Sequence, residues 1–292
     1  MGDPGKLSGR IIAIIGSASG IGAETARRCA GYGATVFLAD IDEQGLTQVV
    51  EEINDSGGRT AWLPVDVSDA ASIERVAEHC IRTFGRVDVV VNCAAILIPG
   101  PMGRISGNQA ARQVEINLLG TIYTSQAFLP RFEAQNSGHL INISSLGGLA
   151  PLPSSAVYGA TKAGVRNFSL ALALEYRRTP IRVSVICPDS VDTPQLAAEA
   201  LGEGSTLSFT SEPLQPADIA DIIIQTILRP RREVLVPRHR GWITKLADIA
   251  PGLMARLYPL LDRSGTERRK AYSRQVQKGV GIEESAAPVK GA

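Results

Sequence analysis

Tyr158 and Lys162 have side chains and a spacing that suit proton transfer. They lie four residues apart in the segment SSAVYGATKAGVRN, residues 154–167. Helical spacing places both on one face, where the ammonium can stabilise a phenolate and lower the tyrosine pKa from its free value of about 10. Ser145, thirteen residues before Tyr158, can hydrogen-bond the same substrate oxygen. The three residue types together predict an acid/base centre that acts on a hydroxyl or carbonyl oxygen.

A glycine-rich loop provides a second chemical signal. The sequence IGSASGIG, residues 15–22, follows an apolar β-branched run and opens a helical stretch. Gly16, Gly20 and Gly22 allow a tight turn and a close approach of the backbone to a pyrophosphate, which then meets the N–H groups at the helix N-terminus. Because the loop stands between a predicted strand and a predicted helix, it predicts a dinucleotide-binding site.

Asp40 stands at the end of the second apolar run, 18 residues after Gly22. A carboxylate at this place accepts hydrogen bonds from the ribose hydroxyls of NAD and repels the additional phosphate of NADP. The next residue is Ile41 rather than an arginine that would neutralise such a phosphate. We therefore expect NAD as the cofactor, with a solvated loop residue as the alternative interpretation of Asp40.

Apolar runs alternate with helical stretches along most of the chain, which predicts an α/β fold with a doubly wound parallel sheet, the Rossmann fold. The expected strands cover residues 10–16, 34–40, 60–67, 87–95, 138–145, 181–188 and 232–237. The expected helices cover residues 21–31, 43–55, 69–84, 108–132, 157–176 and 216–228. Ligands of such sheets lie off the carboxyl ends of the strands, so the residues named above are expected to share one edge.

The strand–helix alternation stops after Pro237. We expect a single NAD-binding catalytic domain over residues 8–240, an amphipathic helical extension over 241–263, and a polar tail over 264–292 with a disordered end. The extension has a break at Pro251 and apolar residues at steps of three and four: Trp242, Leu246, Ile249, Leu253, Leu257 and Leu260. Three roles stay open for it: packing on its own or a neighbouring subunit, a lid over the substrate, and peripheral membrane contact.

Composition limits the remaining possibilities. Hydrophobic residues make up 44% of the 292 residues and charged residues 20%, as in globular proteins, and the net charge of +1 argues against a nucleic-acid partner. The four cysteines are widely spaced and the three histidines have no ligand partners at metal spacing, so no metal site is expected. His139 follows a turn sequence and is expected at the surface. Without a signal-peptide pattern or an apolar run of about 18 residues, the expected location is cytoplasmic.

The motifs, taken in order, make the sequence resemble the classical short-chain dehydrogenase/reductase family over roughly residues 8–237. The family's G-x-x-x-G-x-G loop stands here as Gly16, Gly20 and Gly22, and its acidic ribose ligand as Asp40. Its other motifs are matched by Asp66 and Val67 in the pair DV, Asn92 in NCAA, Asn117 in EINLLGT, and Ser145, Tyr158 and Lys162.

The resemblance implies a role for each matched residue. Tyr158 would be the general acid/base, Lys162 would lower its pKa and hold the nicotinamide ribose, and Ser145 would orient the substrate oxygen. Asn117 would bind a water that links Lys162 to solvent. The implied cofactor contacts are Gly16, Ser19, Gly20, Ile21, Gly22, Asp40, Ile41, Asp66, Val67, Asn92, Ala94, Tyr158, Lys162, Pro188, Val191 and Thr193. The resemblance also implies a homo-dimer or homo-tetramer formed through the helices at 108–132 and 157–176.

Four positions depart from the family pattern. Ile15 replaces the usual threonine, and Cys93 and Ala95 replace the usual asparagine and glycine of the motif after the fourth strand. Asp189 stands where the family usually has glycine. None of the four is a proton-transfer residue, so the departures concern cofactor affinity and loop geometry rather than the type of reaction.

The segment 193–213 is rich in small and apolar residues, which predicts a small apolar alcohol or ketone as substrate, steroid-like or fatty. The first hypothesis is therefore an NAD-dependent secondary-alcohol dehydrogenase. The alternative is a non-catalytic NAD-binding regulator or scaffold that uses the C-terminal helices to hold a partner, but such a module needs none of the four matched catalytic residues. A sugar-nucleotide epimerase or dehydratase ranks last, because those relatives generally use G-x-x-G-x-x-G.

Overall fold

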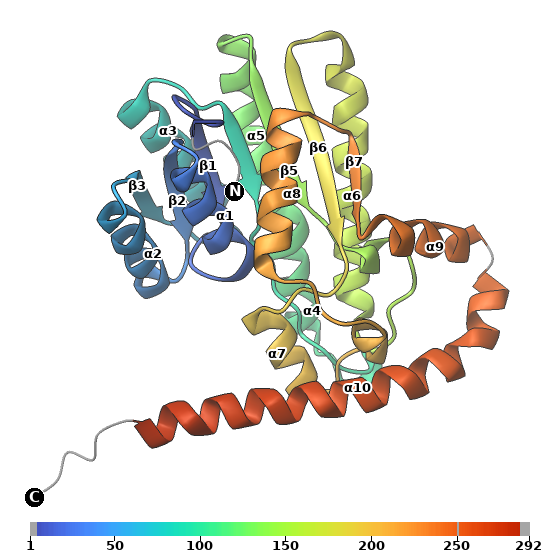
Figure 1. The fold of residues 1–292 in the computed structure, drawn as a ribbon. Coiled ribbons are helices and arrows are strands. Elements are labelled where there is room, and N and C mark those ends of the chain that lie inside the picture. The colour runs from blue at the N-terminus through green and yellow to red at the C-terminus, as the bar shows by residue number, and fades with distance from the viewer. Residues whose placement is uncertain (1–4, 250, 287–292) are drawn as a thin grey trace, which may run out of the picture.

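A seven-stranded parallel sheet forms the centre of the molecule (Figure 1). The computed structural model describes residues 5–249 and 251–286. The strands are β1 (Ile11–Ile15), β2 (Thr35–Asp40), β3 (Arg59–Pro64), β4 (Val89–Asn92), β5 (Gly138–Ile143), β6 (Ile181–Pro188) and β7 (Glu233–Val236). Their order is β3-β2-β1-β4-β5-β6-β7. The order reverses between β1 and β4, so the loops that follow these strands leave the sheet side by side and form the usual ligand crevice.

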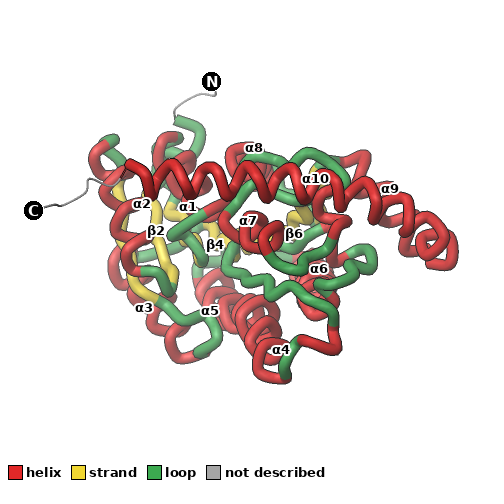
Figure 2. The backbone as a smooth tube through the Cα atoms, turned by 90° about the horizontal axis from the view of Figure 1, so that it is seen from below, coloured by secondary structure: helices red, strands yellow, loops and turns green. Residues whose placement is uncertain are grey.

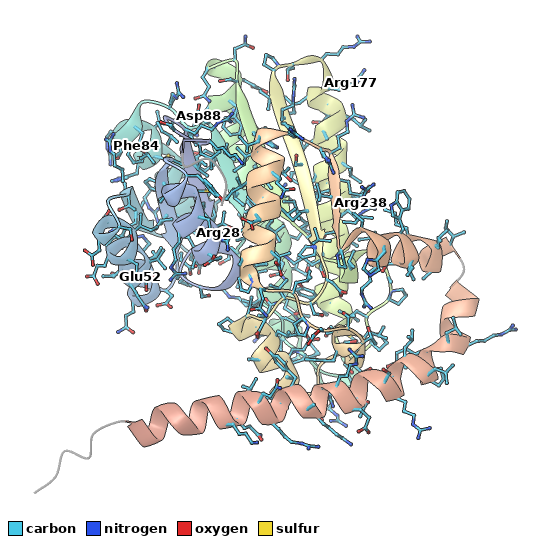
Figure 3. The ribbon with its side chains drawn as sticks, viewed as in Figure 1. Arg28, Glu52, Phe84, Asp88, Arg177 and Arg238 are labelled. Carbon is cyan, nitrogen blue, oxygen red and sulfur yellow. The ribbon has the colours of Figure 1, made fainter. Side chains whose placement is uncertain are left out.

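Helices cover both faces of the sheet, because successive strand residues point to opposite faces. α1 (Gly20–Gly31), α2 (Glu43–Asp55) and α8 (Pro216–Leu228) pack on one face. α3 (Ala70–Phe84), α5 (Gly120–Ala134) and α6 (Ala156–Glu175) pack on the other. Arg28 of α1 forms an ion pair of 2.6 Å with Asp221 of α8, which links two helices of the first layer (Figure 3). The predicted doubly wound sheet is confirmed.

The helix expected at 108–132 is interrupted by a π-helical turn. α4 (Gly107–Val114) ends where the turn Glu115–Leu119 begins, and α5 continues directly from Gly120. Single π turns within helices are frequent at functional sites, and this one contains Asn117. The apolar period of a helix does not reveal one wider turn, so the sequence pattern predicted a continuous helix.

His139 is buried, and its expected surface position is wrong. It is the second residue of β5, with 5% of its surface exposed, and its Nε2 lies 2.8 Å from Ser184 Oγ on β6. β5 lies between β4 and β6 in a sheet that helices cover on both faces, so even the second residue of this strand is buried. Burial lowers the pKa of His139 to about 3, so the imidazole is neutral in the folded protein.

The C-terminal extension consists of two helices, α9 (Arg238–Ile249) and α10 (Pro251–Ala286). α10 continues through the expected boundary at Ser264, so residues 264–286 of the expected polar tail are helical. Residues 287–292, where a disordered end was expected, lie outside the described residues. α10 passes beneath the sheet and crosses α7 (Pro194–Leu201), as the view from below shows (Figure 2).

α10 packs closely on the turn η5 (Thr206–Phe209). A Cβ added to Gly265 would lie 2.0 Å from the backbone oxygen of Thr206, so the helix can approach this closely only with glycine there. The rings of Phe209 and Tyr272 lie 5.8 Å apart between centroids, which continues the same contact along the helix. The extension therefore packs on its own subunit, one of the three roles that the sequence left open.

The outer face of α9 and the start of α10 remain apolar and exposed. Trp242 is 56% exposed, Leu246 64% and Ile249 78%, and Leu260 on α10 is 71% exposed. A peripheral membrane contact through 241–263 stays a prediction. Within the described part of the chain, no helix is long and apolar enough to cross a membrane.

Candidate active site

A cavity of about 560 Å³ opens at the carboxyl edge of the sheet. The loops that follow β1 to β6 line its inner part, and α7, α9 and α10 contribute to its outer wall. All expected site residues except Asn92 and Asn117 line this cavity: Gly16, Ser19, Gly20, Ile21, Gly22, Asp40, Ile41, Asp66, Val67, Ala94, Ser145, Tyr158, Lys162, Pro188, Val191 and Thr193. The structure thus brings together motifs that are spread over nearly 180 residues of sequence.

The glycine loop has the geometry that close backbone approach requires. Gly16 has a φ of +83°, and a Cβ added to it would lie 2.4 Å from the backbone nitrogen of Ala94 in the loop after β4. A Cβ added to Gly22 would lie 1.8 Å from the backbone oxygen of Gly16. The loop can therefore turn tightly enough to direct the N-terminus of α1 at the cavity, which fits a dinucleotide pyrophosphate.

Asp40 lies at the end of β2 and lines the cavity. Its carboxylate accepts hydrogen bonds from the backbone N–H groups of Ala18, at 2.9 Å, and Asp42, at 3.2 Å, which fixes its orientation. Arg112, which also lines the cavity, is ion-paired with Asp66 at 3.3 Å. The charge of this arginine is thus already shared with a carboxylate.

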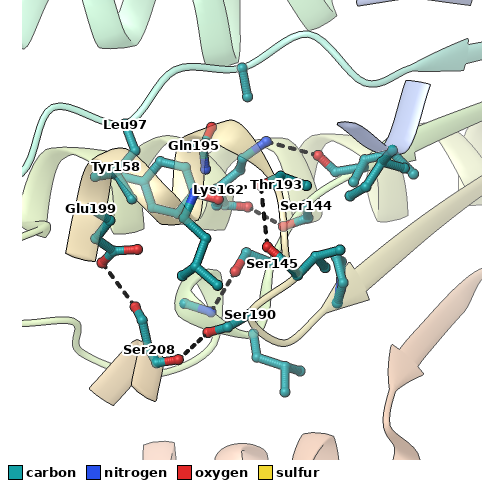
Figure 4. Close-up of a pocket in the computed structure, with 18 of the residues that line it drawn as sticks. Leu97, Ser144, Ser145, Tyr158, Lys162, Ser190, Thr193, Gln195, Glu199 and Ser208 are labelled. Carbon is teal, nitrogen blue, oxygen red and sulfur yellow. Dashed lines mark hydrogen bonds between the residues drawn. The ribbon is translucent and has the colours of Figure 1, made fainter. Parts of the chain in front are cut away.

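The turn η3 (Leu146–Gly148) and α6 bring the proton-transfer residues together (Figure 4). A Cβ added to Gly148 would lie 2.6 Å from the carbonyl carbon of Lys162, so glycine allows the turn after β5 to lie directly on α6. Ser145 and Tyr158 then line the same cavity, and Lys162 Nζ lies 5.7 Å from the centroid of the Tyr158 ring. The expected serine, tyrosine and lysine therefore meet in one place.

Burial dominates the electrostatics of this group. It raises the pKa of Tyr158 to about 12, the Glu199 carboxylate adds to the rise, and hydrogen bonds from two neighbouring side chains act in the opposite direction. Burial lowers the pKa of Lys162 to about 8. Burial therefore shifts the pKa of Tyr158 upward, opposite to the direction expected from a neighbouring ammonium.

Asn117 and Asn92 lie next to the cavity without lining it. Asn117 Oδ1 accepts from the backbone N–H of Ile96 at 2.8 Å, and its Nδ2 donates to Ile96 O at 2.8 Å and to Thr161 Oγ1 at 3.1 Å. Asn92 Nδ2 donates to Asn142 Oδ1 at 2.7 Å. Both amides fix neighbouring backbone and strands. The water relay through Asn117 and the cofactor contact of Asn92 stay predictions.

Asp189, which stands where the family usually has glycine, has a partner in the C-terminal extension. The Asp189 carboxylate forms an ion pair with Arg240 of α9 and accepts a hydrogen bond from Ser211 Oγ at 3.2 Å. Arg240 also donates to Thr210 Oγ1 at 3.0 Å. The carboxylate that replaces the family's glycine thus ties the loop after β6 to the extension.

Several polar residues in the outer part of the cavity were missed by the sequence analysis. Gln195 and Glu199 project from α7, Ser208 from η5, and Thr244 from α9. The available signal was the spacing of four between Gln195 and Glu199 on a helix that directly follows Thr193, itself an expected cofactor contact. This spacing was overlooked because the segment is otherwise mostly small and apolar.

The comparisons with known proteins agree with this site. The family model for short chain dehydrogenases matches residues 10–203, so the chain belongs to the short-chain dehydrogenase family of oxidoreductases. An uncharacterized oxidoreductase of Staphylococcus epidermidis is 30% identical over 225 residues, which cover 77% of this chain and 94% of that protein. One of Staphylococcus haemolyticus is 32% identical with the same coverage. About a quarter of this chain thus lies outside the matched region.

Solved structures give the same architecture. A short-chain dehydrogenase/reductase from Burkholderia phymatum in complex with NAD has a TM-score of 0.78 and 25% identity, covering 85% of this chain and 96% of that chain. An actinorhodin polyketide ketoreductase with NADPH has a TM-score of 0.72 and 28% identity, covering 79% and 95%. The family binds a nicotinamide cofactor, and both forms of it occur among these structures.

Proposed function

We propose that the chain is an NAD-dependent oxidoreductase that interconverts a secondary alcohol and a ketone, with Tyr158 as general acid/base. The observation that carries the proposal is the convergence of Ser145, Tyr158 and Lys162 on one cavity beside the glycine loop. A module that only binds a dinucleotide has no use for a buried phenol, ammonium and hydroxyl at one point.

A nicotinamide dinucleotide bound at the glycine loop would supply the hydride acceptor. In the oxidation direction, Tyr158 Oη accepts the proton of the alcohol while the carbinol carbon gives up its hydride, and the C–O bond becomes a carbonyl. Ser145 Oγ hydrogen-bonds the same oxygen and holds it in place. Lys162 stabilises the phenolate, which matters here because burial raises the pKa of Tyr158 to about 12. In the reduction direction Tyr158 returns the proton.

The cofactor preference is assigned to Asp40. Asp40→Asn keeps an acceptor for the Ala18 N–H but removes the charge that would repel an additional phosphate. We expect the ratio of kcat/KM with NAD to that with NADP to fall by about tenfold, equivalent to about 1.4 kcal/mol. Asp55→Asn, an exposed carboxyl at the far end of α2, is the matched control. A ratio unaffected by Asp40→Asn would count against the proposed NAD preference.

The cavity lining favours an apolar substrate skeleton. Its outer part contains the apolar side chains of Leu97, Leu146, Leu152, Leu196, Leu207, Ile243 and Leu261. Such a surface gains free energy by covering hydrocarbon, roughly 25 cal/mol for each Å² removed from water. We propose a cyclic or fatty secondary alcohol as the substrate class, located with its hydroxyl carbon between Tyr158 and the cofactor.

We also propose a homo-oligomer that uses the outer faces of α4, α5 and α6. Val114 on α4 and Leu174 on α6 are exposed large apolar residues, at 37% and 54%. Their exposure supports a symmetric contact at these helices. Sedimentation of the purified chain with Leu174→Lys, compared with the natural chain, measures whether this face forms the contact.

The catalytic assignment is tested by the absorbance of reduced nicotinamide, with secondary alcohols from short chains to hydroxysteroids. Tyr158→Phe should lower kcat by on the order of 10²–10⁴, because it removes the group that exchanges the proton. NAD binding, measured by calorimetry, should persist. Tyr176→Phe is the control, since that hydroxyl donates to Glu133 outside the cavity. Bound NAD without turnover of any alcohol would instead support the non-catalytic regulator.

A further inference from the structure

A carboxyl group lies in the outer part of the cavity, beside the tyrosine (Figure 4). Glu199 of α7 lines the cavity although only 4% of its surface is exposed. Its Oε1 accepts hydrogen bonds from the backbone N–H of Ser205, at 3.2 Å, and from Ser208 Oγ, at 2.9 Å. Both bonds end on the same oxygen of the carboxyl group. The two bonds that hold the α7–η5 loop therefore occupy only Oε1, and they do not explain why a second carboxyl oxygen is present.

The loop alone does not require a carboxyl group here. A glutamine amide oxygen could accept the same two hydrogen bonds without the cost of burying an ionisable group. Gly204 makes room for the Glu199 side chain, since a Cβ added to Gly204 would lie 2.2 Å from Glu199 Cγ. Arg269 of α10 donates to Gly204 O at 2.8 Å, which places one cation near the group without an ion pair to it.

We infer that Glu199 is a second recognition point for the substrate and binds a hydroxyl group carried on an otherwise apolar alcohol or ketone. The inference rests on the proposed alcohol–ketone chemistry and narrows its substrate to a diol or hydroxy ketone. A few convergent polar groups in an apolar pocket usually fix the orientation of a ligand.

A hydroxyl fits this position better than an ammonium. Burial raises the pKa of Glu199 to about 7, so both protonation states occur near neutral pH. A hydroxyl donates to the carboxylate and accepts from the protonated acid, whereas an ammonium pairs only with the carboxylate. An ammonium would also share the cavity with Lys162 and lie near Arg269. The charges around the site therefore favour a neutral hydrogen-bonding group.

The test uses cyclohexanol and the vicinal diol of cyclohexane with NAD and the full chain. The measured quantity is the ratio of kcat/KM for the diol to kcat/KM for the monool, which cancels general losses of activity. We expect a ratio of roughly ten to one hundred in the natural chain, and at least about a tenfold fall in Glu199→Met. Glu203→Gln, an exposed carboxyl one turn further on that pairs with Arg104, is the matched control.

Glu199→Gln is a second variant that should leave the structure of the α7–η5 loop unchanged. Its amide oxygen can keep the hydrogen bonds from Ser205 and Ser208, while its amide nitrogen replaces the second oxygen and can donate to a hydroxyl but not accept from it. The ratio should fall in this variant too, but less than in Glu199→Met, because the hydrogen bond to an ionised carboxylate is the stronger one. A natural ratio near one overturns the inference. The inference is also overturned if the ratio is unchanged in Glu199→Gln and falls in Glu199→Met only when the melting temperature falls as well.

Calorimetric titration of the NAD-saturated chain with the diol separates this inference from the proposed function. Diol binding that depends on Glu199 without any turnover would support the recognition point and refute the proposed reaction. Turnover of both alcohols with equal efficiency would support the reaction and refute the recognition point. A natural chain that neither binds nor oxidises the diol overturns the inference.

Discussion

Tyr158, Lys162 and Glu199 share an environment that favours their uncharged forms. Burial raises the pKa of Tyr158 to about 12 and that of Glu199 to about 7, and lowers that of Lys162 to about 8. The common cause is desolvation, since each group loses water without a full complement of opposite charge. A positive charge that enters the cavity would favour the phenolate and the carboxylate, although the Glu199 carboxylate itself raises the pKa of Tyr158.

The raised pKa of Glu199 predicts a pH-dependent stability. The carboxyl titrates near 4.5 when unfolded and at about 7 in the folded chain. The folded state therefore binds an additional proton between these values, and stability falls as the pH rises from about 4.5 to about 7, by up to about 3 kcal/mol. Glu199→Gln removes this loss. Its melting temperature should match that of the natural chain near pH 4 and exceed it near pH 8. A difference that does not change with pH contradicts the buried ionisation.

Two helices of the extension hold the segment that follows β6. Arg240 of α9 pairs with Asp189 at its start, and Tyr272 of α10 donates to Asp192 three residues later. Further along, Thr206 Oγ1 donates to Asp262 of α10 at 2.7 Å. The segment that carries the outer wall of the cavity is thus fixed between the sheet and the extension, and the position of α7 depends on both.

The pair Asp189–Arg240 can be tested by a double-mutant cycle. Asp189→Gly restores the residue typical of the family, and Arg240→Ala removes the partner. Because the side chains are 11% and 30% exposed, their coupling should be about 1–2 kcal/mol, between surface and buried pairs. We expect each single variant to raise the substrate KM several-fold and the double variant to be little worse. Effects on melting temperature that simply add would show that the two residues act independently.

The sheet and the convergence of Ser145, Tyr158 and Lys162 on one cavity were predictable because their signals are local. The glycine loop, the strand ends and the spacing of Tyr158 and Lys162 are each contained in a short stretch of sequence. The pair Asp189–Arg240 was not predicted, since its two residues come from segments separated by a long stretch of chain. Glu199 was not predicted either: its partners Ser205 and Ser208 are near in sequence, but its burial in the cavity depends on the fold. Burial reversed the expected direction for the Tyr158 pKa, because the sequence shows which groups meet but not how much water they lose.

At the scale of the whole molecule, α10 joins the outer wall of the cavity to the C-terminal end of the described chain. Its 36 residues, which include Pro259, correspond to about 54 Å along the helix. It crosses α7 (Figure 2) and packs on η5. Leu261 and Ser264 of this helix line the cavity directly. A shift of α10 would therefore change the cavity while leaving the sheet and the glycine loop in place.

The dependence of the cavity on the position of α10 can be tested at Gly265. Gly265→Val would place side-chain atoms against the backbone of Thr206, where a Cβ alone would already lie 2.0 Å from the oxygen. We expect the substrate KM to rise about tenfold and NAD affinity to change by less than about twofold. Gly252→Val is the matched control, because a Cβ at that position of the same helix meets no atom within 4 Å. Equal effects of the two substitutions would argue that α10 does not shape the cavity.

The division of the cavity between two parts of the chain has an evolutionary consequence. The residues proposed for proton transfer and phosphate binding lie within 10–203, the segment that the family model matches, whereas Arg240, Ile243 and Leu261 lie beyond it. Under the proposed function, mutations in the extension can therefore alter which alcohols are admitted while the chemistry is inherited unchanged. A library of variants restricted to α9 and the first half of α10 should therefore contain members that accept new substrates, and few members should lose catalytic activity.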